Sequence, residues 1–118
     1  MFQATLAKLV AQSEARWAMI VGSDGVLVET DNLSFRAEAE NLAAVFAAFY
    51  RSSRKAATDT DMGCLHASLL VVDQGKVLLQ ALTADYFLIV FLAGHEHTGK
   101  AFFEMSRAAA PLTQELSF

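Results

Sequence analysis

The amino-acid sequence predicts an α+β fold, a three-layer α/β/α arrangement with helices on both sides of one five-stranded antiparallel sheet. Three observations favour it. The apolar residues alternate between helical spacing and short strand-like runs, in the order α-β-β-α-β-β-β-α. Short turns join consecutive strands, which makes those strands antiparallel. The 118 residues contain no linker or repeat, so 1-118 is expected to be a single domain.

The first quarter of the chain predicts a helix followed by a hairpin. Residues Phe2–Glu14 carry apolar side chains on one helical face. Trp17–Val21 is apolar on both faces, which is typical of a central strand. Gly22-Ser23-Asp24-Gly25 is turn sequence, and Val26–Thr30 returns as the second arm. After a polar loop, we expect Ser34 to cap the next helix.

The second half predicts three strands and a final helix. The turns 73–75 and 83–85 separate the strands Leu65–Val72, Lys76–Leu82 and Tyr86–Leu92. The last strand is apolar throughout and should lie beside Trp17–Val21 in the centre, whereas the more polar first strand should lie at an edge. The last helix runs from Thr98 to about Ala110, and Pro111 is expected to end or kink it.

The middle helix, residues 34 to 58, has more apolar surface than one small sheet can use. At 100° per residue its apolar arc spans roughly 200°, where about 100° serves one core. We therefore expect a second copy of the helix to cover the surplus in a homodimer. Small side chains at 39, 43 and 47 would let that helix approach closely, although close packing on the helix's own sheet is the alternative. The expected interface comprises Ala39, Ala43, Phe46, Ala47, Tyr50, Leu65, Ala67 and Leu69.

Composition narrows the classes of partner and compartment. Hydrophobic residues make up 54% of the chain and charged residues 19%, an apolar balance that favours an interface. The net charge of −4 gives no indication of a nucleic acid or anionic membrane partner. No segment has the pattern of a signal peptide or a membrane span. Cys64 is the only cysteine, which is typical of a reducing compartment, so a cytoplasmic protein is expected.

A possible phosphate-binding loop lies at Gly94–Lys100. The segment from Gly94 to Ala101 matches GxxxxGK[ST] at every position but the last, between a strand and a helix. Ala101 replaces the hydroxyl that would bind Mg²⁺, and an antiparallel sheet does not supply the usual context. A degenerate P-loop-like nucleotide-binding protein is therefore the alternative function, and an ordinary helix start is the simpler interpretation.

Other chemical sites find little support. His95 and His97 flank Glu96 in one loop, while Cys64 and His66 share a strand face. Together they could contribute metal ligands, but no spacing enforces a site, so neither a metal nor a cofactor is expected. Few polar residues converge inside the core, which argues against a small-molecule sensor. No activated nucleophile is evident, and we expect no catalytic residues.

In its pattern of strands, turns and helices, the chain resembles the Roadblock/dynein light chain family. The matching segments are the hairpin from Ala18 to Val28, the alanine-rich helix, the meander beginning Leu69 to Leu79, and Tyr86 to Gly94 before the final helix. The resemblance implies that the middle helix covers one sheet face and the terminal helices the other. It also implies a homodimer, or a heterodimer with another Roadblock-like chain, formed through the middle helix and the edge strand. The family's usual role is non-catalytic: binding or regulating a small Ras-like GTPase, or scaffolding a complex.

A partner would then meet the side of the middle helix that faces away from its large apolar residues. We expect Glu40, Ala44, Ala48, Arg51 and Lys55 to make those contacts. The basic residues Arg51, Arg54 and Lys55 could meet an acidic partner. The plainer interpretation is a solvated helix end that the helix dipole favours.

Overall fold

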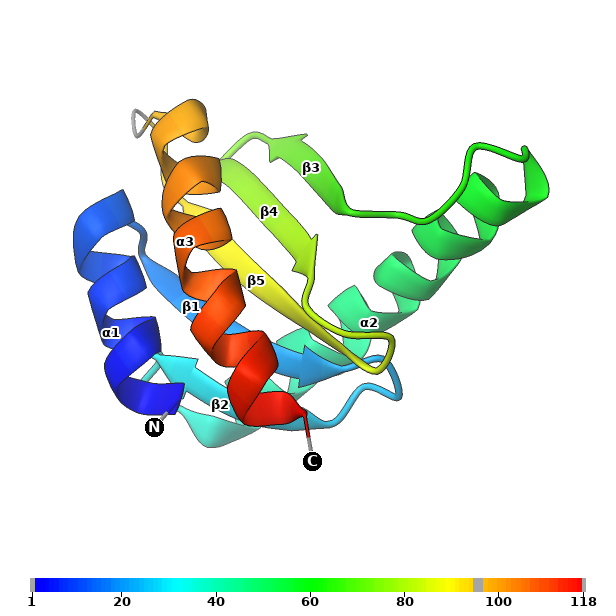
Figure 1. Cartoon of the computed structure of the whole chain (residues 1–118). Helices are drawn as coiled ribbons and strands as arrows, with labels where there is room; N and C mark the ends of the chain where they lie inside the picture. The colour runs from blue at the N-terminus through cyan, green and yellow to red at the C-terminus, as the bar shows by residue number, and fades with distance from the viewer. Residues whose placement is uncertain (1, 95–96, 118) are drawn as a thin grey trace.

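The computed structural model describes residues 2–94 and 97–117, and its elements follow the predicted order. The N-terminal helix leads into a hairpin, a long middle helix, a three-strand meander and a final helix (Figure 1). Their bounds are α1 Phe2–Ser13, β1 Trp17–Gly22, β2 Leu27–Asp31, α2 Arg36–Asp59, β3 Ala67–Val72, β4 Gly75–Ala81, β5 Tyr86–Leu92 and α3 Thr98–Leu116. The predicted α+β class is confirmed.

The five strands form one antiparallel sheet in the order β2-β1-β5-β4-β3. The two most apolar strands, β1 and β5, lie side by side as predicted, with Trp17 paired to Phe91 and their rings stacked at 5.6 Å. Strand β3 lies at one edge, which also confirms the prediction. The strands that are apolar on both faces take the inner positions because both faces of the sheet are covered there.

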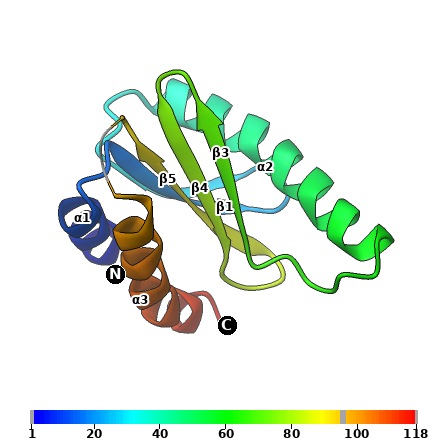
Figure 2. The same cartoon turned by 90° about the horizontal axis from the view of Figure 1, so that it is seen from above.

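Helices cover the two faces of the sheet unequally. Figure 2 shows α2 along one face and the neighbouring helices α1 and α3 on the other. Alternate residues of each strand therefore enter different cores, as the two-residue period of a strand requires. On β1, Ile20 packs with the terminal helices and Met19 packs with α2. On β5, Leu88 and Ile89 divide in the same way.

The expected Ser34 cap is wrong. Helix α2 begins at Arg36, after Phe35 at the N-cap position, and no side chain caps it. Phe35 is extended, with φ −107° and ψ 115°, and its carbonyl accepts the first helical hydrogen bond from the N–H of Ala39 at 3.1 Å. Ser34 therefore precedes the position from which a hydroxyl reaches the free N–H groups of the first turn.

Proline does not end the last helix. Helix α3 continues through Pro111 to Leu116, although proline removes one backbone donor and disfavours the helix before it. Pro111 itself is exposed, while Leu112 is fully buried and Leu116 is 5% exposed in the core beneath α3. The burial of these leucines offsets the lost hydrogen bond, so tertiary packing overrides the local signal.

Candidate interaction surface on the middle helix

Helix α2 lies on its own sheet through its alanine row. Ala39, Ala43 and Ala47 are completely buried, Tyr50 is 2% exposed, and all four belong to the core that α2 shares with the sheet. The prediction that these four residues face a second subunit is therefore wrong, and the alternative of close packing on the sheet is correct. Alanines four residues apart form a ridge low enough for the helix backbone to approach the strands closely.

The large apolar residues of α2 lie beside this row rather than in it. We call them the apolar flank: Leu42, Val45, Phe46 and Phe49. Three of them are half-buried against the core, while Val45 is 57% exposed. The surplus apolar surface expected from the sequence is thus present on α2, but the bulky side chains form it and the alanines do not. The place of Phe46 in a dimer interface stays a prediction.

A broad hollow of about 620 Å³ borders the apolar flank. It lies between α2 and the β3–β4 end of the sheet, and its floor is largely apolar. Among the described residues, the lining comprises Trp17, Glu38, Leu42, Phe46, Leu70, Val72, Asp73, Gln74, Val77 and Phe91. Helix α2 therefore leaves a strip of its own sheet face uncovered near the edge strand.

Strand β3 brings the other predicted interface residues to the open edge of the sheet. Within the described part of the chain it pairs with β4 alone, so its outer N–H and C=O groups face outward. Leu65, just before the strand, is half-buried; Ala67 is exposed and Leu69 is 44% exposed. Val71 is 69% exposed on the same strand. The edge is thus both unpaired and apolar.

The predicted partner-binding residues gather on the other side of the alanine row. We call them the polar flank: Glu40, Ala44, Ala48, Arg51 and Lys55. All five are exposed, and helical spacing places them in one stripe. The β1–β2 turn borders this stripe, because Gly25 lies against Ala44 and Ala47. Helix α2 therefore presents two chemically different flanks. One consists of bulky apolar side chains, and the other combines alanines with charged side chains.

The C-terminal half of α2 is anchored by an aromatic pair. The rings of Tyr50 and Phe87 stack at 4.1 Å with an interplanar angle of 5°, and the Arg54 guanidinium lies 5.5 Å from the centre of the Tyr50 ring. Burial raises the pKa of Tyr50, and the positive charge and hydrogen bonding of Arg54 offset part of that rise. The buried phenol thus stays neutral above the pH at which an exposed tyrosine ionises.

We predict that this tyrosine makes stability depend on alkaline pH. The pKa of Tyr50 is higher in the folded chain than in the unfolded one, so its contribution is complete below about pH 10 and is lost as pH rises through the folded pKa. Urea midpoints should therefore fall more steeply above about pH 10 for the wild type than for Tyr50→Phe. Equal slopes would show that the phenol makes no contribution.

The loop before α3 lacks the surroundings of a phosphate-binding loop. His95 and Glu96 lie outside the described residues, and Thr98, Gly99 and Lys100 form the first turn of α3. Ala101 is fully buried in the core, so its position does not face a bound ion. The strand that precedes the loop pairs with antiparallel neighbours on both sides. This environment gives the nucleotide-binding alternative no support.

The His and Cys residues considered as metal ligands form no cluster within the described residues. Cys64 and His66 are exposed just before β3, and His97 is exposed at the start of α3. Within residues 2–94 and 97–117, no group of three His, Cys, Asp or Glu side chains could hold a metal ion. His95 lies outside these ranges.

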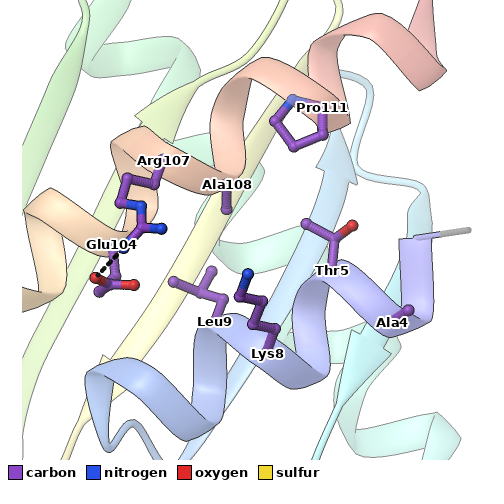
Figure 3. Close-up of a pocket in the computed structure, with 8 residues that line it drawn as sticks. All are labelled: Ala4, Thr5, Lys8, Leu9, Glu104, Arg107, Ala108 and Pro111. Atoms are coloured by element: carbon purple, nitrogen blue, oxygen red, sulfur yellow. Dashed lines mark hydrogen bonds and ion pairs between the residues drawn. The ribbon is translucent and has the colours of Figure 1, made fainter.

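A separate hollow of about 300 Å³ lies between α1 and α3 on the opposite sheet face (Figure 3). Glu104, 9% exposed, pairs with Arg107 at 3.4 Å, and Lys8 extends from α1 toward them. Its charges are mixed, one carboxylate and two cations, so it favours no ligand sign. Lys8 is nevertheless a useful reference cation, far from α2.

Comparisons with known proteins agree on one family. The family model for the Roadblock/LC7 domain matches residues 1–93. A Roadblock/LC7 domain from Streptomyces avermitilis superposes with TM-score 0.92 at 17% identity, covering 98% of each chain. Myxococcus xanthus MglB gives 0.90 at 14% identity, covering 97% of this chain and 93% of that one.

A structure of MglB with tetrameric arrangement gives a TM-score of 0.85 at 14% identity, covering 94% of this chain and 84% of that one. At these identities the likeness concerns the fold. A comparison with curated protein sequences gives no match. Among the described helices, none combines the length and the apolar character needed to cross a bilayer.

Proposed function

We propose a function from one premise, that this chain belongs to the Roadblock/LC7 domain family. The family-model match covers most of the chain and agrees with the resemblance in its hairpin and meander. We infer that the protein is a non-catalytic, homodimeric interaction module that binds and regulates a small Ras-like GTPase or scaffolds a complex. The observation that carries this proposal is the pair of unlike flanks on α2.

The apolar flank and the edge of β3 support self-association. In the proposed homodimer, two β3 edges pair antiparallel about a twofold axis perpendicular to the sheet, which keeps both α2 helices on the same side. Each apolar flank then covers the uncovered strip of the other subunit. Pairing at the edge satisfies the outward N–H and C=O groups of β3. The tetrameric arrangement of MglB, a relative in fold, supports self-association.

The revised interface keeps part of the sequence-based assignment. It retains Phe46 of the helix and Leu65, Ala67 and Leu69 at the edge strand. It adds the exposed and half-buried members of the apolar flank, together with Leu70 and Val72 beside the hollow. It omits the alanine row and Tyr50, because the monomer's own core already buries them. A heterodimer with another Roadblock-like chain would use the same surface.

The polar flank is the proposed site for the GTPase. Ala44 and Ala48 expose backbone and small side chains, which allow a partner element to approach closely, while Glu40, Arg51 and Lys55 offer charges for specificity. In a dimer this flank stays accessible because it lies on the opposite side of α2 from the apolar flank. We propose a regulatory effect through the conformation of the GTPase rather than through a donated catalytic group. The reducing cytoplasm is the proposed location.

Binding of a GTPase tests this function directly. The small Ras-like GTPases of the organism that makes this chain would be loaded with GDP or a non-hydrolysable GTP analogue and titrated by calorimetry. We expect saturable binding of one GTPase, with a preference for one nucleotide state. Ala48→Arg should weaken binding by about tenfold or more, because it places a bulky charge within the contact surface.

The matched control is Ala11→Arg, an exposed alanine of α1 on the other sheet face, which should bind like the wild type. Loss of binding in both variants would assign the effect to charge or folding rather than to α2. Failure of every GTPase to bind the wild type would refute the GTPase-binding function.

A further inference from the structure

The C-terminal end of the polar flank opens into a hollow with a definite charge. We call it the basic hollow: Arg51, Arg54 and Lys55 with Ser23, Thr58 and Asp59, enclosing about 370 Å³. Three cations and one carboxylate line it, within a chain whose net charge is −4. A local positive field on an acidic protein attracts an anionic group.

Backbone carbonyls hold the two guanidinium groups in place. Arg51 Nη1 donates to the carbonyl of Ser23 at 2.6 Å, in the β1–β2 turn. Arg54 Nη1 donates to the carbonyl of Ala84 at 3.0 Å, in the β4–β5 turn, and its guanidinium also lies over the Tyr50 ring. These bonds are to neutral acceptors, so the positive charges are not cancelled. Each guanidinium has five N–H donors, so donors remain for a ligand.

Lys55 contributes a third cation. Its Nζ lies 2.7 Å from Asp59 Oδ2, but both side chains are largely exposed. An exposed ion pair of this kind is weak, so Lys55 can exchange its partner for another carboxylate at little cost. The hollow therefore combines two fixed guanidinium groups with one ammonium that is free to turn toward an incoming anion.

We propose that the basic hollow receives an acidic segment of the partner protein, one with several closely spaced aspartate or glutamate side chains. The inference rests on the proposed function, since Arg51 and Lys55 belong to the polar flank that the GTPase is proposed to contact. Arginine forks match carboxylates geometrically. The cradle of a nucleotide phosphate, by contrast, needs a glycine-rich loop or a helix N-terminus, and the hollow lies at the C-terminal turns of α2.

A short acidic peptide tests the hollow without any GTPase. The ¹⁵N-labelled chain would be titrated with a tetraglutamate peptide blocked at both ends, and the Nε–Hε signals of Arg51 and Arg54 followed by NMR. We expect saturable shifts that weaken as salt is raised. The double variant Arg51→Glu/Lys55→Glu should lose them, with at least about tenfold weaker binding. Arg54 is left unchanged because it helps to anchor α2.

The control for charge is Lys8→Glu/Lys100→Glu, two exposed lysines outside α2, which makes the same total change and should leave the shifts intact. Absence of shifts in the wild type, or equal losses in both double variants, would overturn the proposal. Inorganic phosphate forms a further arm. Shifts with phosphate but none with tetraglutamate would also overturn it, because the hollow would then hold a small anion only.

The two proposals fail in different ways. If the wild type binds the GTPase and Arg51→Glu/Lys55→Glu binds it equally well, the acidic contact is overturned and the proposed function stands. If the wild type binds no GTPase while tetraglutamate shifts both arginines, the GTPase function is overturned and the hollow retains its specificity for acidic segments. Circular dichroism confirms folding of each variant before binding is compared.

Discussion

Gly75→Ala is expected to destabilise the fold by about 3 to 5 kcal/mol, a large share of a typical domain's stability. Gly75 opens β4 with φ +152°, where side chains are rarely tolerated. A Cβ atom there would lie 2.0 Å from the Leu92 carbonyl oxygen and 3.0 Å from the Ala93 Cα. These neighbours are backbone atoms, so no side-chain rotation relieves the overlap. The first residues of β4 must therefore move away from β5.

Urea unfolding at one fixed protein concentration measures this loss, since stability depends on concentration in a dimer. The matched control is Gly99→Ala in the first turn of α3, where an added Cβ meets nothing within 4 Å. That change should leave stability unaltered or raise it by up to about 1 kcal/mol, because alanine favours helices. A loss of less than about 1 kcal/mol for Gly75→Ala would contradict the geometry of this turn.

Val45→Glu is expected to separate the proposed dimer into folded monomers. Val45 is 57% exposed in one chain, so glutamate should be tolerated by the monomer. In the proposed dimer the same position would bury a charge without a partner, which is costly. The dissociation constant should rise by about 100-fold or more, equivalent to about 2.8 kcal/mol. Light scattering should then give the 12.8 kDa chain mass for the variant and twice that mass for the wild type.

Ala48→Glu is the control for this substitution, because it adds the same charge to an exposed position on the polar flank of the same helix. It should remain dimeric. A wild-type protein with the mass of one chain at high concentration would contradict the homodimer. A dimer unaffected by Val45→Glu would place the interface elsewhere.

Much of the architecture could be predicted because strand and turn signals here are local. Trp17–Val21 and Tyr86–Leu92 are apolar on both faces, and this property alone indicates two inner strands. The turn at 73–75 fixes the antiparallel return of the next strand. Residue spacing likewise identified the polar flank as one continuous stripe of α2, since neighbours on a helix follow from 100° per residue.

The orientation of α2 could not be predicted in the same way. Periodicity shows which residues share a side of a helix, but not which of two apolar sectors faces the sheet. The alanine row was assigned to a dimer interface, yet it faces the sheet, because a low ridge permits closer packing. The continuation of α3 past Pro111 was missed for a related reason: Leu112 is buried against α1, which lies far away in the sequence.

The unpaired edge of β3 makes a free monomer prone to aggregation. Ala67–Val72 reads ASLLVV, without a charge or a proline, and several of its side chains are exposed. Short segments of this composition at an open edge recruit strands from other molecules and can grow into cross-β fibrils. A chain left unpaired in the proposed dimer would thus be prone to aggregation. The strand that is proposed to form the dimer therefore also limits the concentration at which free monomer stays in solution.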